Sequence, residues 1–209
     1  MGIQIGCYVI GMIQTNCYYV WREGSDACIV FDPADMGLKL YEALEEKELS
    51  VQAIFLTHGH YDHIYGVEAL RKASGARVYA PMAEKDVCLD PQLNCSRDFG
   101  RVCTVSADKW LADGETVTEA GITLRMLLTP GHTEGSSCYY IEEAGALISG
   151  DTLFEESVGR TDLPTGSMRD LVDSVKQKLY VLPDETGVYP GHGGFTTIGH
   201  EKTYNYFVH

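Results

Sequence analysis

The chain has 209 residues, of which 44% are hydrophobic and 22% are charged, a composition that is ordinary for a soluble globular protein and excludes disordered and fibrous classes. This length suits one folding unit, and we expect residues 1–209 to form a single domain. The net charge of −14 repels phosphate groups and anionic lipid, so we expect neither a nucleic acid nor a membrane as a partner.

The N-terminal segment has no basic leading run, and Gln, Thr and Asn interrupt its apolar stretch. It therefore predicts neither a signal peptide nor a membrane span, and we expect a cytoplasmic protein. The seven cysteines are odd in number and none forms a C-x-x-C pair. This pattern favours buried thiols over a disulfide framework or a thiolate metal site.

Short runs of apolar, β-branched and aromatic residues predict strands at 3–10, 15–21, 27–31, 51–56, 77–80, 122–128, 137–143, 146–149 and 186–189. Helical periodicity predicts helices at about 38–47, 62–73 and 167–182, and a last helix after Gly199. Residues 90–110 have no steady period and predict a long irregular connection. Strands in both halves, with helices between them, favour an α+β fold in which two sheets pack face to face beneath outer helices.

Polar side chains directly follow five of the predicted strands, in the stretches IVFDP, IFLTHGHYDH, LLTPGH, LISGD and GVYPGH. Active sites are commonly built at strand ends, because the sheet fixes the backbone while the loop frees the side chain. Five of the seven histidines lie in these junctions. If neighbouring strands run in the same direction, one rim of the fold gathers seven candidate ligands: His58, His60, Asp62, His63, His132, Asp151 and His192.

Imidazole and carboxylate groups are ligands for zinc or iron, and seven of them are too many for one tetrahedral site. We therefore predict two ions that are bridged by a carboxylate and water. The H-x-H spacing lets His58 and His60 reach one ion, whereas Asp62 and His63 point elsewhere and can serve a second ion. Asp151 is the natural bridge, because a carboxylate can join two metals and an imidazole normally cannot.

Each of these residues taken alone also has a structural interpretation. His132 or His192 could be a hydrogen-bonded turn histidine, Asp62 a helix N-cap and Asp151 an Asx-turn residue. The dense motif HGHYDH, together with three further ligand types at strand ends, favours metal binding over these alternatives. A non-catalytic structural site is also disfavoured, because such a site closes with four ligands and needs no bridge.

These motifs resemble those of the metallo-β-lactamase-fold hydrolases, whose H-x-H-x-D-H pattern is HGHYDH here. The stretches TPGHTEGSS, SGDTLF, SVGRTDLP and YPGHG make the chain look most like the short glyoxalase II-like (hydroxyacylglutathione hydrolase-like) branch. The resemblance implies a four-layer αββα sandwich with its site at one edge of the two sheets. It also implies two metals that are bridged by Asp151. The first metal is held by His58, His60 and His132, and the second is held by Asp62, His63 and His192.

The resemblance further implies two divalent ions, zinc before iron or a mixed zinc and iron pair, which lower the pKa of a bridging water. The metal-bound hydroxide then attacks the carbonyl carbon of a thioester of the hydroxyacylglutathione type, or of a related ester. Asp62 is the candidate catalytic residue, because it can orient the nucleophile as well as bind metal. A thiolate leaving group needs no strong general acid, which suits motifs that have no spare His or Glu.

Arg160, in SVGRTDLP, and Tyr61, inside the metal loop, are the substrate-binding candidates. A guanidinium can grip a carboxylate through two hydrogen bonds, so we expect a small anionic thioester as the substrate. The alternative is a structural pair between Arg160 and Asp162 or Asp151.

The chain ends at residue 209, so we expect it to lack the helical C-terminal domain whose basic residues help full-length glyoxalase II enzymes to bind glutathione. The competing function is a mononuclear-iron persulfide dioxygenase. Enzymes of that class keep a similar His and Asp motif and a related RTD loop.

Overall fold

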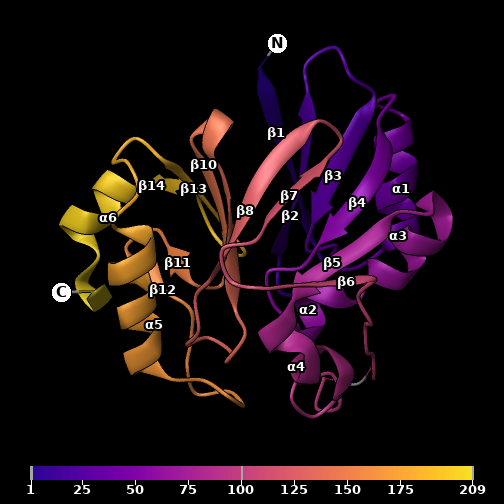
Figure 1. Cartoon of the computed structure of the whole chain (residues 1–209). Helices are drawn as coiled ribbons and strands as arrows, with labels where there is room; N and C mark the ends of the chain where they lie inside the picture. The colour runs from indigo at the N-terminus through magenta and orange to yellow at the C-terminus, as the bar shows by residue number, and fades with distance from the viewer. Residues whose placement is uncertain (1, 100, 209) are drawn as a thin grey trace.

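The computed structural model describes residues 2–99 and 101–208. Its first half forms a six-stranded sheet (Figure 1). The strand order across this sheet is β1 (Ile3–Ile10), β2 (Thr15–Arg22), β3 (Ala27–Phe31), β4 (Ser50–Phe55), β5 (Arg77–Pro81) and β6 (Lys109–Leu111).

The second half forms another six-stranded sheet, which packs against the first. A small hairpin of β11 (Leu153–Phe154) and β12 (Ser157–Val158) lies beside it. The strand order across this second sheet is β14 (Thr196–Thr197), β13 (Gly187–Pro190), β10 (Ala146–Gly150), β9 (Ser137–Ile141), β8 (Ile122–Leu128) and β7 (Thr116–Glu119).

Helices cover the outer face of each sheet, as Figure 1 shows. The first sheet carries α1 (Gly37–Glu45) and α3 (Val67–Ser74), and the second carries α5 (Met168–Ser174) and α6 (Ile198–Tyr204). A π-helical turn, η3 (Val175–Leu179), continues α5. The short helical elements are α2 (Tyr61–Ile64), η1 (Met82–Glu84), α4 (Lys85–Leu89), η2 (Glu142–Ala144) and η4 (Tyr206–Val208).

Three hydrophobic clusters fill the spaces between these four layers. The first packs α1 side chains such as Leu44 against the outer face of the first sheet. The second lies between the two sheets and includes Phe55 and Tyr139. The third packs Leu171 of α5 against Leu147 of β10. The predicted four-layer αββα sandwich is therefore confirmed.

Strand β3 shows why its sequence is apolar at every position. Cys28 and Val30 belong to the cluster beneath the helices, whereas Ile29 and Phe31 belong to the cluster between the sheets. Successive side chains of a strand point to opposite faces. A strand that is covered on both faces must therefore be apolar throughout rather than alternating.

The strand directions satisfy the condition on which the predicted convergence depended. Strands β3 to β6 pair in parallel, and so do β10 and β13. Strand β8 runs in the same direction as β10, because both are antiparallel to β9. The loops after β4, β8, β10 and β13 consequently leave the carboxyl ends of strands that are aligned within each sheet.

The helix predicted over 62–73 is instead two helices, α2 and α3. Between them the Gly66 N–H donates a 2.8 Å hydrogen bond to the Pro33 carbonyl, and a Cβ at Gly66 would lie only 2.5 Å from that oxygen. This close approach turns the chain between the two helices. The N-cap of α2 is His60, so Asp62 lies in the first turn rather than at the cap.

Within the described residues, no helix combines the length and the apolar character that crossing a membrane requires. The cytoplasmic location stays a prediction. So does the single domain over 1–209, a range that includes three positions outside the described residues, namely Met1, Gly100 and His209.

Candidate metal centre

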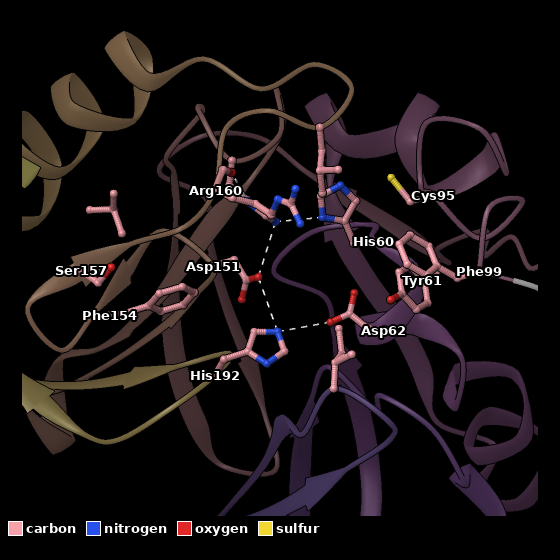
Figure 2. A pocket seen from close by; sticks show the side chains of 14 residues that line it. His60, Tyr61, Asp62, Cys95, Phe99, Asp151, Phe154, Ser157, Arg160 and His192 are labelled. Atoms are coloured by element: carbon pink, nitrogen blue, oxygen red, sulfur yellow. Dashed lines mark hydrogen bonds and ion pairs between the residues drawn. The ribbon is translucent and has the colours of Figure 1, made fainter.

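All seven predicted ligands come together where the strand ends of the two sheets meet, and Figure 2 shows four of them, His60, Asp62, Asp151 and His192, around the pocket above. The loop after β4 supplies two histidines, and helix α2 supplies an aspartate and a histidine. The loops after β8, β10 and β13 supply one residue each. In chain order, these side chains are His58, His60, Asp62, His63, His132, Asp151 and His192.

Three buried histidines form a first donor group. The donor atoms of His58, His60 and His132 all lie within 4.8 Å of one another, and His60 Nδ1 is 2.8 Å from His132 Nε2. Burial lowers the pKa of His60 to about 3 and also lowers the pKa of His58 and of His132. These imidazoles are therefore neutral at physiological pH, which is the form that binds a metal.

A second donor group consists of Asp62, His63 and His192, whose donor atoms also lie within 4.8 Å of one another. Asp62 Oδ2 is 3.4 Å from His63 Nε2 and 3.3 Å from His192 Nε2. Although burial opposes it, the pKa of His63 is raised by the surrounding carboxylates, chiefly Asp62 and Asp151. The pKa of His192 is raised in the same way, against burial, by its hydrogen bond to Asp62.

Asp151 lies between the two groups. Its Oδ1 is 3.4 Å from His63 Nε2, and its Oδ2 is 3.5 Å from His132 Nε2 and 3.6 Å from His192 Nε2. Burial would raise the pKa of Asp151, but the facing histidines, above all His63, hold it well below the usual range. Asp151 is therefore an ionised carboxylate that faces both groups.

Several donor atoms in this cluster have no hydrogen-bond partner among the described residues. They include Nε2 of His58, Nε2 of His63 and Oδ1 of Asp151, and the donor atoms of these three residues lie within 4.8 Å of one another. Buried polar atoms without partners are costly, and an ion bound among them would remove the cost. With nitrogen and oxygen donors suited to zinc or iron, the cluster fits a dinuclear metal site.

Asp32, which was not among the predicted site residues, contacts Thr57 and the candidate ligand His63. Its Oδ1 accepts the Thr57 N–H at 2.8 Å, and its Oδ2 accepts the Thr57 hydroxyl at 2.6 Å and lies 3.0 Å from His63 Nδ1. His63 thus donates through Nδ1 and keeps the Nε2 lone pair for a metal. The sequence signal was its position, since Asp32 follows strand β3 directly.

Two further histidines are oriented in the same way. The Thr57 hydroxyl donates to Asp32, so it is left to accept from His58 Nδ1 at 3.1 Å. His132 Nδ1 donates to the Arg160 carbonyl oxygen at 2.7 Å. Each contact assigns the proton to Nδ1 and directs Nε2 toward the cluster.

Glu84, a second residue that was missed, joins the two loops of the first donor group. It is fully buried, and its Oε1 accepts the N–H of Gly59, the residue between His58 and His60, at 2.9 Å. Both of its oxygens lie 2.9 Å from the hydroxyl of Thr133, the residue after His132. Burial raises the pKa of Glu84 to about 7. No sequence motif marks this residue, because its partners are distant along the chain.

A pocket of about 520 Å³ opens over the cluster. Tyr61 lines it and stacks on Phe99, with ring centroids 4.6 Å apart. Arg160 also lines the pocket, but its guanidinium forms two hydrogen bonds with Asp162, at 2.7 and 2.8 Å. This pair is one of the two structural alternatives that the sequence left open. Figure 2 shows Arg160 and Tyr61 on different sides of the pocket.

Comparison with known families agrees with this geometry. Residues 10–192 match the model of the metallo-beta-lactamase superfamily. The chain belongs to this superfamily.

Three proteins illustrate what this chain is similar to. Hydroxyacylglutathione hydrolase GloC from Haemophilus influenzae is 34% identical over 199 residues, which cover 93% of each chain. The crystal structure of BLEG-1 B3 metallo-beta-lactamase has a TM-score of 0.93 and 38% identity, and the match covers 98% of this chain and 99% of that one. The structure of TTHA1623 in a di-iron-bound form has a TM-score of 0.86 and 33% identity, with 97% and 99% covered.

Proposed function

We propose that this member of the metallo-beta-lactamase superfamily is a hydrolase that uses two metal ions to cleave a thioester of the hydroxyacylglutathione type or a related ester. One observation carries the proposal: two adjacent donor groups share Asp151 beneath an open pocket. The similarity to a hydroxyacylglutathione hydrolase over almost the whole chain supports the substrate class.

We propose that the first donor group, His58, His60 and His132, binds one ion and that the second, Asp62, His63 and His192, binds the other. Asp151 is shared between the ions. When bound, the two ions would supply Lewis acidity, which lowers the pKa of a water and polarises the substrate carbonyl. Zinc is the metal that we propose, and iron or a mixed pair is the alternative, since the similar TTHA1623 is described in a di-iron-bound form.

Asp62 is the residue that we propose to orient the attacking water. Its Oδ2 accepts a 3.1 Å hydrogen bond from the Thr15 hydroxyl, and the residue lines the pocket. Burial would raise the pKa of Asp62, but the charge of His63 keeps it lowered. The ionised carboxylate can therefore accept a hydrogen bond from water at the pocket floor.

The partner that we propose is a small anionic thioester. Arg160 lines the same pocket as the cluster, and a guanidinium has five N–H donors, so a substrate carboxylate can share it with Asp162. Tyr61, which Figure 2 shows beside Asp62, can contact the body of the substrate. A thiolate would leave without a proton from the protein.

The direct test is hydrolysis of S-D-lactoylglutathione. We expect the wild-type protein to cleave it, and Asp151→Ala to lower kcat by roughly 100-fold or more while the protein stays folded, because the carboxylate shared by the donor groups is lost. Asp26→Ala, a change at an exposed residue before β3, is the matched control. Equal turnover by both variants would contradict the proposed centre.

Two other reactions compete for the same pocket. The similarity to BLEG-1, which is described as a B3 metallo-beta-lactamase, favours β-lactam hydrolysis as the second candidate, and nitrocefin turnover measures it. The persulfide dioxygenase alternative predicts one iron per chain and oxygen uptake with glutathione persulfide. Either activity without cleavage of S-D-lactoylglutathione would overturn the thioesterase proposal.

A further inference from the structure

A second cavity of about 500 Å³ adjoins the metal pocket. The two cavities share Ile13, Tyr61, Asp62 and Phe99 in their linings, so they lie next to each other at the edge of the donor cluster. Figure 2 shows Tyr61 and Phe99 side by side near Asp62, and both of these side chains line both cavities. A ligand with its carbonyl over the cluster lies next to both cavities, because Asp62, a member of the cluster, lines both of them.

Exposed apolar side chains help to line this second cavity. Met12, in the turn between β1 and β2, is 100% exposed, and Phe99 is 59% exposed. The stacked Tyr61 lies beside Phe99. Apolar side chains grouped around a cleft commonly mark a ligand-binding groove, because a bound molecule removes them from water.

A pair of opposite charges also lines the cavity. Arg101 Nη2 is 2.8 Å from Asp35 Oδ1, and the guanidinium lies over the Tyr65 ring, 3.8 Å from its centroid. The Arg101 side chain is 54% exposed and that of Asp35 is 31% exposed, so both charges face solvent. A guanidinium has five N–H donors, and this contact engages only one nitrogen. The pair is complementary to a group that carries both a carboxylate and an ammonium.

We propose that the second cavity binds the thiol half of the substrate, and that Arg101 and Asp35 bind a zwitterionic, amino-acid-like end of that thiol. The inference rests on the proposed thioester hydrolysis, in which a carbonyl over the cluster must carry an acyl group on one side and a thiol on the other. A short acyl group needs little of the 520 Å³ pocket, and the adjoining cavity of about 500 Å³ offers further space for a peptide-sized thiol. Arg160 and Arg101 then contact opposite ends of one substrate.

Binding of S-methylglutathione, which has the zwitterionic end but no thioester, tests the subsite without any turnover. We expect calorimetry on the metal-loaded protein to show binding, and Arg101→Ala to weaken it about tenfold through the loss of a charge-assisted contact. Arg97→Ala is the matched control, since Arg97 is an exposed residue of the same loop and lines neither cavity. Absence of binding to the wild-type protein, or equal binding by the two variants, would overturn the subsite.

Kinetics separate the subsite from the proposed function. Arg101→Ala should raise KM for S-D-lactoylglutathione about tenfold, and should affect it far more than KM for S-D-lactoyl-N-acetylcysteamine, whose thiol is uncharged. Equal effects on both thioesters would overturn the subsite while leaving the hydrolase proposal intact. If the wild-type protein binds S-methylglutathione through Arg101 yet cleaves neither thioester, the hydrolase proposal fails and the zwitterion subsite stands.

Discussion

At the scale of single residues, the centre depends on hydrogen bonds that choose the tautomer of each histidine. Asp32, Thr57 and the Arg160 carbonyl each face an Nδ1 atom, so that Nε2 of His58, His63 and His132 is left for a metal. The ligand types were predictable from their positions at strand ends. Their protonation was not, because the partners of each ring come from other loops.

The Asp32 carboxylate should therefore matter for metal affinity although it binds no metal. Asp32 has a φ of 47°, a backbone conformation that asparagine tolerates, so Asp32→Asn removes the charge and keeps the fold. We expect metal affinity to fall by roughly 10- to 100-fold in competition with a chromophoric chelator. The exposed Asp26→Asn change is the control, and the same affinity in both variants would show that the Asp32 contact does not orient His63.

The two ions should respond differently to pH. In the metal-free protein the pKa values of His63 and His192 are raised, so these rings hold protons that a metal must displace, whereas the pKa of His60 is lowered to about 3 and its ring is already neutral. Falling pH should therefore weaken the Asp62, His63 and His192 group first. Titrations with zinc at successively lower pH should show two tight sites at first and then only one. Parallel loss of both ions would argue against this assignment.

At the scale of elements, the loop after β4 and the loop after β8 act as one unit because Glu84 joins them. Glu84 lies at the end of η1, after β5, and contributes no ligand of its own. Motif analysis of the sequence cannot identify a residue of this kind. The effect of Glu84 should instead be measurable in the unfolding free energy of the metal-free protein.

The raised pKa of Glu84 fixes the sign of that effect. Its value of about 7 in the folded protein exceeds the usual 4.5, so the folded state binds more protons than the unfolded state between these values, and wild-type stability falls as pH rises through them. The Glu84→Gln variant has no carboxyl group to ionise at this position, so its stability should not fall in this way. Between about pH 5 and pH 8 the unfolding free energy of the variant, measured with urea, should gain on the order of 2 kcal/mol relative to the metal-free wild-type protein. A constant difference would contradict the ionisation of Glu84 in the folded state.

Other elements were only partly predictable from the sequence. The long strands and the outer helices follow from hydrophobic period, since each buries one or two faces. The short strands β6, β7 and β14 carry too few residues to show a period and are set by the neighbours with which they pair. The division of residues 62–73 into α2 and α3 depends on a backbone contact between Gly66 and Pro33, which lies outside any local pattern.

At the scale of the whole molecule, two sheets bring their strand ends to one edge, and the cluster draws on both. The resemblance of HGHYDH to the H-x-H-x-D-H motif of the metallo-beta-lactamase superfamily was sufficient to predict the sandwich fold and the superfamily. The second cavity could not be predicted in the same way. It combines the turn after β1, the loop after β3, helix α2 and the two side chains of Phe99 and Arg101, and nothing in the sequence places these segments side by side.

We propose that Asp151 joins two metal sites rather than supporting one. The metal-to-protein ratio of the wild-type chain, purified without chelator and analysed by inductively coupled plasma mass spectrometry, measures this directly. We expect about two zinc or iron ions per chain, as a carboxylate-bridged pair requires. A ratio of one after saturation with metal would contradict it.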